Sequence, residues 1–485
     1  MSDDLKQKTV TGVSWSFIEQ ILARGVNFII GIILARLLSP TDYGLVGMLG
    51  IFIALSQLFI DGGLTSALIR TKSPSDEDYS TVYIVNVTLS VVFYAVLFVI
   101  APYVALFYEQ PLLKPLLRVI ALTLVINTLS SIQGTVLAIR VDFKTKTYIS
   151  IGSSIVTGIV GIVCAYKGLG VWALVAQNLA FSVFFTISTL VAVHWMPRLV
   201  FSKESFKRLF SYSSKLLAAS IVSVIYDNAY PLVIGKRFTA ADVGQYSRAG
   251  QFPGIANGTI TGALNRVAFP VLSKIQDDDE RLLRVYEKYV QLACFIIFPV
   301  LMWLCGSARP LVSFLLTDKW LECVPLMQII CFALLTNCLT TINLNLLYVK
   351  GRSDLVLRLE IIKKSIAFTI LFVSMFFSIK VMCYGQVLYS FIALYLNTYY
   401  TNRILGYTFG QQVRSVAPYF LISLIVLAEA ALSSFLIHIN MISLIVSAAV
   451  CPLTYWFITK KTDLYAYREA KGLISARFPS IGAKF

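Results

Sequence analysis

Charged residues are scarce in this chain: they make up 14% of its 485 residues, against about 25% in an average soluble domain. Histidine is nearly absent, with His194 and His438 far apart, and none of the eight cysteines forms a Cys-x-x-Cys pair. No connection is long enough to fold as a separate soluble domain. With a mean hydropathy of +0.77, these shortages exclude a water-soluble globular protein and a disordered chain. They also argue against a metal site or a disulfide framework built on cysteine.

Long apolar runs are abundant instead, and a membrane-crossing helix needs about 20 mostly apolar residues. Fourteen segments meet this requirement, which predicts an all-α integral membrane protein with about fourteen transmembrane helices. A porin-type barrel does not fit, because its strands alternate over about ten residues. The segments cover residues 13–36, 44–67, 81–106, 115–137, 148–166, 171–195, 215–235, 244–270, 288–309, 323–348, 361–379, 384–404, 415–437 and 441–459.

The formal net charge of +16 sorts by side of the predicted membrane. An even number of spans places both termini on one side. That side and its adjoining span ends hold 29 Lys and Arg residues, against 8 on the other side. By the positive-inside rule, both termini and the connection at 203–208 are cytoplasmic. The charge therefore indicates orientation and contact with anionic membrane lipids, and no nucleic acid is expected as a partner.

The first half of the chain resembles the second. Residues 36–44, Arg-Leu-Leu-Ser-Pro-Thr-Asp-Tyr-Gly, match residues 236–244 at an offset of 200, and 127–133 match 337–343 at an offset of 210. The matches include Asp, Gly and Asn at turns, which random similarity between apolar helices explains poorly. Each copy has six spans, an even number, so both share one topology. This predicts a parallel repeat related by an axis along the membrane normal.

The repeat predicts four parts: a six-helix lobe over 1–212, a second six-helix lobe over 213–405, two additional transmembrane helices over 406–459, and a basic cytoplasmic tail over 460–485. At the first matched turn, Ser39 or Asp42 can cap the next helix, and Gly44 permits close packing at its start. The turn at 239–244 is expected to act in the same way. We interpret both turns as structural hairpins on the outer side.

Charged side chains inside predicted spans are the first candidates for function, because a charge near the bilayer centre is costly unless it faces protein or water. Arg24 lies near the middle of the first span, on a polar stripe with Asn27. Asp227 occupies the position of Asn27 in the second repeat. Pro231, one turn after Asp227, is expected to break or kink its helix.

These features predict a water-filled cavity between the two lobes, lined by the first, second, seventh and eighth spans. The alternative is that the small and polar residues pack helices closely together. For the Gly, Ser and Thr positions this alternative is at least as good, whereas for Arg24 and Asp227 the cavity is favoured. The predicted substrate contacts are Arg24, Asn27, Gln57, Asp227, Arg248, Gln251 and Arg266.

Signals for catalysis are missing from the sequence. We find no Walker A motif, no metal-spaced His/Glu group and no Gly-x-Ser-x-Gly elbow. The chain is therefore expected not to be an enzyme and to hold no cofactor or metal, apart from a coupling ion, H⁺ or Na⁺.

The spans, the repeat and two N-terminal segments, Gly-Val-Ser-Trp-Ser at 12–16 and the run at 35–44, resemble a known family. The chain is similar to the polysaccharide-transporter branch of the multidrug/oligosaccharidyl-lipid/polysaccharide exporter superfamily, and within it to exporters of O-antigen, colanic acid and teichuronic acid. The resemblance covers essentially the whole chain. It implies a flippase that moves undecaprenyl-diphosphate-linked oligosaccharide across the bacterial inner membrane by alternating access driven by an ion gradient.

The resemblance also implies partners, namely the lipid-linked oligosaccharide, membrane lipids, and the polysaccharide polymerase and chain-length machinery. Two other functions stay open. A cation-coupled multidrug antiporter of the same superfamily is expected to centre on acids in its cavity, so the mid-span Arg24 counts against it. A membrane polysaccharide polymerase or ligase usually carries a substantial outer loop with catalytic residues, whereas the outer connections here are short.

Overall fold

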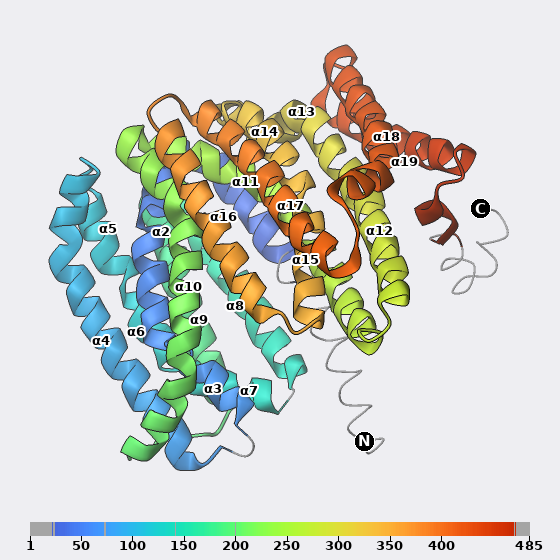
Figure 1. Ribbon diagram of the computed structural model, residues 1–485. Helices are drawn as coiled ribbons and strands as arrows, with labels where there is room; N and C mark the ends of the chain where they lie inside the picture. Colours follow the sequence, from blue (N-terminus) through green and yellow to red (C-terminus); the bar gives the residue numbers. More distant parts are fainter. Residues whose placement is uncertain are drawn as a thin grey trace. The chain divides into compact units, whose positions relative to one another are not determined.

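The computed structural model describes residues 22, 25–71, 74–140, 142–198, 200–469 and 471, and every regular element in these residues is helical. Nine of the described helices are long and apolar enough to cross a membrane. The count is ten if the pair Leu113–Thr128 and Ser131–Ile139, bent by 44°, forms one span. The chain is therefore an all-helical, multi-span membrane protein (Figure 1).

Three further helices are long but more polar than the helices counted above. They are therefore not counted among the candidate spans, and the number fourteen stays a prediction. α10 (Lys203–Arg237), α11 (Ala240–Lys274) and α16 (Ser353–Ser374) have 35, 35 and 22 residues. Each is long enough to cross, since a helix rises 1.5 Å per residue. The first predicted span lies partly outside the described residues, which include its helix Gly25–Leu37.

The chain divides into two compact units, Met1–Gly244 and Gln245–Phe485, which we call unit 1 and unit 2. In unit 1, α8 packs on α9, and α10 packs on α2, α3 and α4. α10 thus lies with unit 1. The lobes predicted from the repeat, 1–212 and 213–405, stay a prediction. The described helices of unit 1, besides Gly25–Leu37 and α10, are α2 (Pro40–Asp61), α3 (Leu64–Arg70), α4 (Asp76–Phe107), α5 (Leu113–Ile120), α6 (Leu122–Thr128), α7 (Ser131–Ile139), α8 (Phe143–Tyr166) and α9 (Val171–Ala192).

Unit 2 begins inside α11 and contains the remaining helices. α12 packs on α18, and α18 packs on α19; the three lie side by side in Figure 1. α17 packs on both α14 and α16. Besides α11 and α16, the elements are α12 (Asp279–Gly306), α13 (Ala308–Leu316), the short 3-10 turn η1 (Asp318–Trp320), α14 (Cys323–Leu335), α15 (Asn337–Val349), α17 (Ile379–Leu405), α18 (Phe409–Leu436) and α19 (Asn440–Lys461).

The predicted helix caps at the two matched turns are confirmed. Ser39 accepts from the backbone N–H of Asp42 at 3.2 Å, and the Asp42 carboxylate accepts from the Ser39 N–H at 2.8 Å. In the second turn, Thr239 accepts from the Asp242 N–H at 3.2 Å, and the Asp242 carboxylate accepts from the Thr239 N–H at 3.0 Å. The two copies of the motif therefore start α2 and α11 with the same reciprocal cap.

α10 runs without interruption from Lys203 to Arg237, so Pro231 does not break the helix, and the kink expected as the other outcome stays a prediction. A proline inside a helix removes one N–H group, but neighbouring packing can keep the helix continuous. α10 is packed on α2 on both sides of this residue. A Cβ added at Gly50 would lie 3.5 Å from the Asn228 side-chain oxygen, and one added at Gly235 would lie 2.9 Å from the Met48 side chain.

Candidate functional site

The matched turns touch each other reciprocally within unit 1. A Cβ added at Gly44 would lie 1.6 Å from the carbonyl oxygen of Ala240, and one added at Gly244 would lie 2.0 Å from that of Pro40. Gly44 and Gly244 are equivalent in the repeat, as are Pro40 and Ala240. Two equivalent surfaces that exchange the same contact are the signature of two-fold pairing. The contact also confirms that Gly44 permits close packing at the start of α2.

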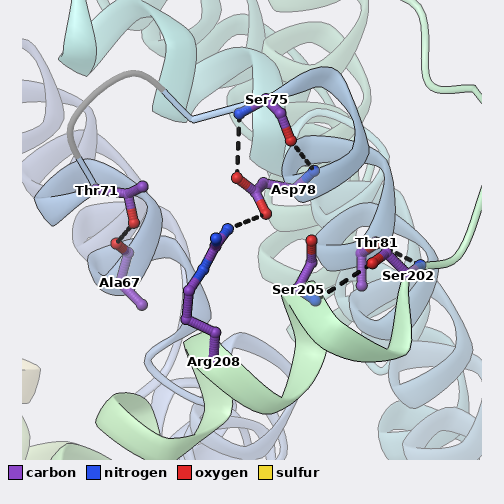
Figure 2. A network of polar contacts seen from close by, with 8 residues as sticks. All are labelled: Ala67, Thr71, Ser75, Asp78, Thr81, Ser202, Ser205 and Arg208. Atoms are coloured by element: carbon purple, nitrogen blue, oxygen red, sulfur yellow. Dashed lines mark hydrogen bonds and ion pairs between the residues drawn. The ribbon is translucent and has the colours of Figure 1, made fainter.

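A polar network holds the start of α10 to the start of α4 (Figure 2). Arg208 forms a 2.5 Å ion pair with Asp78, whose side chain is only 3% exposed. The Asp78 carboxylate also accepts from the backbone N–H of Ser75, at 3.1 Å. The backbone N–H of Ser202 donates to Thr81 at 3.0 Å. These contacts position the helix that carries Asp227.

We expect Asp78→Ala to lower the free energy of unfolding by about 2–3 kcal/mol, because it removes charge-assisted hydrogen bonds from a buried carboxylate. Arg208→Ala should cost less, since its side chain is 58% exposed and the other bonds of Asp78 remain. The control is Arg198→Ala, which removes a 3.5 Å pair with Asp76 whose side chains are 74% and 54% exposed. Thermal unfolding in detergent measures all three. Equal losses for Asp78→Ala and the control would refute the role of the network.

A stripe of residues at helical spacing runs along α2 through Gly50, Gln57 and Asp61. Gly50 faces Asn228 of α10, whose amide donates to the carbonyl of Val224 at 2.9 Å. Gln57, two turns further, has an exposed side chain. Asp61 is only partly exposed and accepts a 2.5 Å hydrogen bond from the Thr65 hydroxyl. The stripe therefore has a packed end near Gly50 and an open position at Gln57.

Asp227 has an exposed carboxylate, and the described residues provide it with no ion pair or hydrogen bond. Its backbone is unusual as well. Pro231 has no N–H group, so the carbonyl of Asp227, four residues earlier, lacks its usual helical donor. Asp227 thus offers two oxygen groups, the side-chain carboxylate and the free carbonyl. The carboxylate can take up a proton, and the carboxylate and the carbonyl together can ligate a small cation.

The remaining predicted contacts at the N-terminal end are partly outside the described residues. Asn27 has an exposed side chain on helix Gly25–Leu37. Arg24 lies outside the described residues, so its role stays a prediction. The structure therefore places Asn27, Gln57 and Asp227 in unit 1 with exposed side chains, and shows no direct bond among them.

Arg248 and Gln251 come together on α11 in unit 2. The Arg248 guanidinium donates to the Gln251 side-chain oxygen, and its carbon lies 5.6 Å from the centre of the Trp320 ring. Arg248 is 7% exposed and Trp320 is fully buried. A guanidinium over an aromatic face gains cation–π attraction and a fixed orientation. Arg266, further along α11, is exposed and has no hydrogen-bond or ion-pair partner among the described residues.

Four glycines of α11 lie where no described neighbouring helix of unit 2 is packed closely against them, so packing within unit 2 does not explain them. They recur every fourth residue and so lie along one face of the helix. No atom among the described residues of unit 2 comes within 4 Å of a Cβ added at any of them. By contrast, a Cβ added at Gly306, at the end of α12, would lie 2.7 Å from the Ala430 side chain. The open glycines are Gly250, Gly254, Gly258 and Gly262.

A buried polar cluster in unit 2 was not singled out as functional from the sequence. Gln412 of α18 donates to the Tyr286 hydroxyl of α12 at 2.9 Å, and Asn343 of α15 donates to the Thr398 hydroxyl of α17 at 3.3 Å. The Thr398 hydroxyl donates to Gln412 at 2.6 Å, which closes the cluster. Such bonds hold membrane helices together. The repeat offers one sequence indication of this cluster: Asn343 matches the polar residue Gln133 of the first half, and both are fully buried.

An apolar cavity of about 510 Å³ lies among α12, α18 and α19. Its walls include Phe295, Val300 and Trp303 of α12 and Pro452 of α19. The lining suits a hydrocarbon chain. Within the part of the chain that the structure describes, no three His, Cys, Asp or Glu residues are grouped so that they could hold a metal ion.

The sequence of this chain is similar to those of known proteins. Residues 33–325 match the model of a protein family described as "Polysaccharide biosynthesis protein". The succinoglycan biosynthesis transport protein ExoT of Rhizobium meliloti (strain 1021) is 28% identical over 355 residues, 72% of this chain and 71% of that protein. The lipopolysaccharide biosynthesis protein WzxC of Escherichia coli (strain K12) is 25% identical over 365 residues, 74% and 73% of the two chains.

Solved structures show the same fold. The lipid II flippase MurJ in an inward closed conformation has a TM-score of 0.74 at 13% identity, over 93% of this chain and 99% of that chain. An inward-facing multidrug resistance transporter of the MATE family, in the MOP superfamily, has a TM-score of 0.61 at 14% identity, over 79% and 95%. At these identities the likeness concerns the fold alone.

Proposed function

The chain belongs to the polysaccharide biosynthesis protein family, whose members are membrane transporters and not enzymes, and from this premise we propose that it is a flippase for lipid-linked oligosaccharide. The substrate class is undecaprenyl-diphosphate-linked oligosaccharide. It moves from the cytoplasmic to the outer leaflet of the bacterial inner membrane by alternating access. Both termini are cytoplasmic, and the flipped lipid passes to the polymerase and chain-length machinery.

The observation that carries the proposal is the free carboxylate of Asp227. Asp227 lies near the middle of the predicted span 215–235, and an ionisable side chain there is costly unless it binds an ion or lines a water-filled path. Asp227 is exposed, has no partner among the described residues, and is joined by its own free carbonyl. This combination supports coupling to a H⁺ or Na⁺ gradient.

The other predicted site residues have cationic and amide side chains, which suit the diphosphate and the sugars of the substrate. Arg266 is exposed and unpaired among the described residues, and Arg248 is held against Trp320. A guanidinium binds a diphosphate through paired hydrogen bonds. Exposed amides such as Gln57 and Asn27 suit sugar hydroxyls. The apolar cavity among α12, α18 and α19 suits the hydrocarbon chain of a lipid-linked substrate.

We expect Arg24→Ala to stop oligosaccharide export while the protein stays in the membrane, because the change removes a mid-span cation for the diphosphate. Arg24→Lys should keep part of the activity as a point charge but lose any bidentate bond to phosphate. The measurement is surface polysaccharide in a strain without the wild-type gene, normalised to the amount of membrane protein. Normal export by Arg24→Ala would contradict the assignment of Arg24.

The predicted orientation can be tested because seven of the eight cysteines are buried and Cys164 is partly exposed. After Cys164→Ala, a cysteine placed at exposed Lys167 should react in intact cells with a reagent that cannot cross the membrane. A cysteine placed at exposed Lys207 should react only after the cells are opened. Strong labelling at position 207 in intact cells would reject cytoplasmic termini.

A cation-coupled multidrug antiporter is the second candidate, since the fold is shared with a MATE transporter. Arg248 and Arg266 count against it, because fixed cations repel cationic drugs. Drug-resistance assays in a sensitive strain distinguish the two candidates. Resistance to cationic drugs without rescue of polysaccharide export would favour the antiporter.

A further inference from the structure

A polar cavity of about 380 Å³ opens in unit 2, and its lining includes none of the predicted substrate contacts. It lies where three candidate spans end or begin: α12 ends at Gly306, α18 ends at Leu436 and α19 begins at Asn440. The ends of membrane spans lie at the depth of the lipid head groups. A polar cavity at this level faces head-group phosphates and the adjoining water.

The cavity is lined by two side chains with basic nitrogen groups, and they come from separate elements. Arg309 comes from the first turn of α13, and His438, one of two histidines in the chain, comes from the connection between α18 and α19. Both side chains are exposed, and neither has a hydrogen-bond or ion-pair partner among the described residues. Their donors are therefore available to a ligand.

A short chain of hydrogen bonds holds the cavity wall in place. The Asn440 amide donates to the Ser313 hydroxyl at 3.0 Å, and the Ser313 hydroxyl donates to the Asp318 carboxylate. This chain joins α19, α13 and η1. Asp318 is the one carboxylate that lines the cavity in the described part of the chain, and it opposes an anion there. Ser434 adds a hydroxyl from α18.

We propose that this cavity binds a phosphate group. Guanidinium and imidazole donors with hydroxyl groups match the oxygens of a phosphate, whereas a cation would meet Arg309. The phosphate has two sources, the head group of a membrane lipid and a free phosphate compound in solution. On the predicted orientation the cavity lies on the outer side. The inference does not depend on the proposed transport function, because binding is measured without transport.

The lipid source is tested by native mass spectrometry of the purified full-length protein with phosphatidic acid, and with phosphatidylcholine for comparison. We expect Arg309→Ala to weaken phosphatidic acid binding about tenfold, by loss of a charge-assisted bond. His438→Ala should weaken it less. Asp318→Asn should strengthen binding about threefold, because it removes the repelling charge while keeping an acceptor for Ser313. Lys380→Ala is the matched control, as it removes an exposed cation outside the cavity on the same predicted side.

The free source is tested by calorimetric titration of the same protein with inorganic phosphate. Lipid binding that falls in Arg309→Ala and rises in Asp318→Asn supports a head-group site. Inorganic phosphate binding with the same dependence supports a site for soluble phosphates. Equal binding of phosphatidic acid and of inorganic phosphate by the wild type, Arg309→Ala, Asp318→Asn and Lys380→Ala would overturn the proposal. Arg309→Lys guards against misfolding, because it keeps the charge and should retain part of the binding.

Discussion

Asp227→Asn is expected to retain lipid-linked oligosaccharide and to lose gradient-driven transport at least about tenfold, because an amide can neither take up nor release a proton. The variant keeps the shape of the side chain and restores the amide that the first repeat has at Asn27. It also leaves Pro231 and the free carbonyl of residue 227 in place. Any loss is therefore due to the carboxylate. Transport and binding are measured separately in vesicles with an imposed gradient.

Asp61→Asn is the matched control for this prediction. Asp61 is a carboxylate on neighbouring α2, and the Thr65 hydroxyl already donates to it. Asparagine keeps an acceptor for that bond, so Asp61→Asn should transport normally. If Asp227 instead serves as the partner of an arginine, neutralising that arginine should rescue Asp227→Asn. Unchanged gradient-driven transport in Asp227→Asn would eliminate both roles and leave a residue that packs two helices.

Gly44→Val is expected to cause the largest loss of stability, about 3 kcal/mol or more, with loss of export. A Cβ at this position would lie 1.6 Å from the Ala240 carbonyl oxygen, and backbone cannot move aside as a flexible side chain does. Gly244→Val should cost a similar amount, because its Cβ would lie 2.0 Å from the Pro40 carbonyl oxygen. Thermal unfolding of the purified variants gives the size of each loss.

The reciprocal contact predicts that the two losses are coupled. Once one valine has separated the turns, the other should meet less resistance, so the double variant should lose less than the sum of the two. Gly250→Ala is the control: its Cβ would meet no described atom within 4 Å, and alanine favours a helix over glycine by about 1 kcal/mol. Full additivity, or a Gly44→Val protein as stable as the wild type, would refute the two-fold contact.

Local features of the fold were predictable from the sequence because they depend on nearby residues. The cap of α2 needs only Ser39 and Asp42, three positions apart, and the same spacing recurs at Thr239 and Asp242. Long apolar runs likewise predicted membrane helices. The close approach at Gly44 was predicted from its place at the start of α2, where a glycine permits close packing.

Features that depend on tertiary packing were not predictable. The missing N–H of Pro231 predicted a break or a kink, and packing of α10 on α2 keeps the helix continuous, so the break does not occur. The bonds among Tyr286, Asn343 and Gln412 join residues up to 126 positions apart, and no local pattern indicates their partners. The pairing of Arg248 with Trp320 has the same origin.

Oligosaccharide flipping by the purified protein in proteoliposomes is the most direct test of the central proposal. Undecaprenyl-diphosphate-linked oligosaccharide is placed in one leaflet, and its appearance in the other is followed with a membrane-impermeant glycan-binding probe. We predict that the wild-type protein moves the lipid faster when a H⁺ or Na⁺ gradient is imposed, and that Asp227→Asn does not respond to the gradient. Movement no faster than in protein-free liposomes, with the protein folded and correctly inserted, would contradict the proposed function.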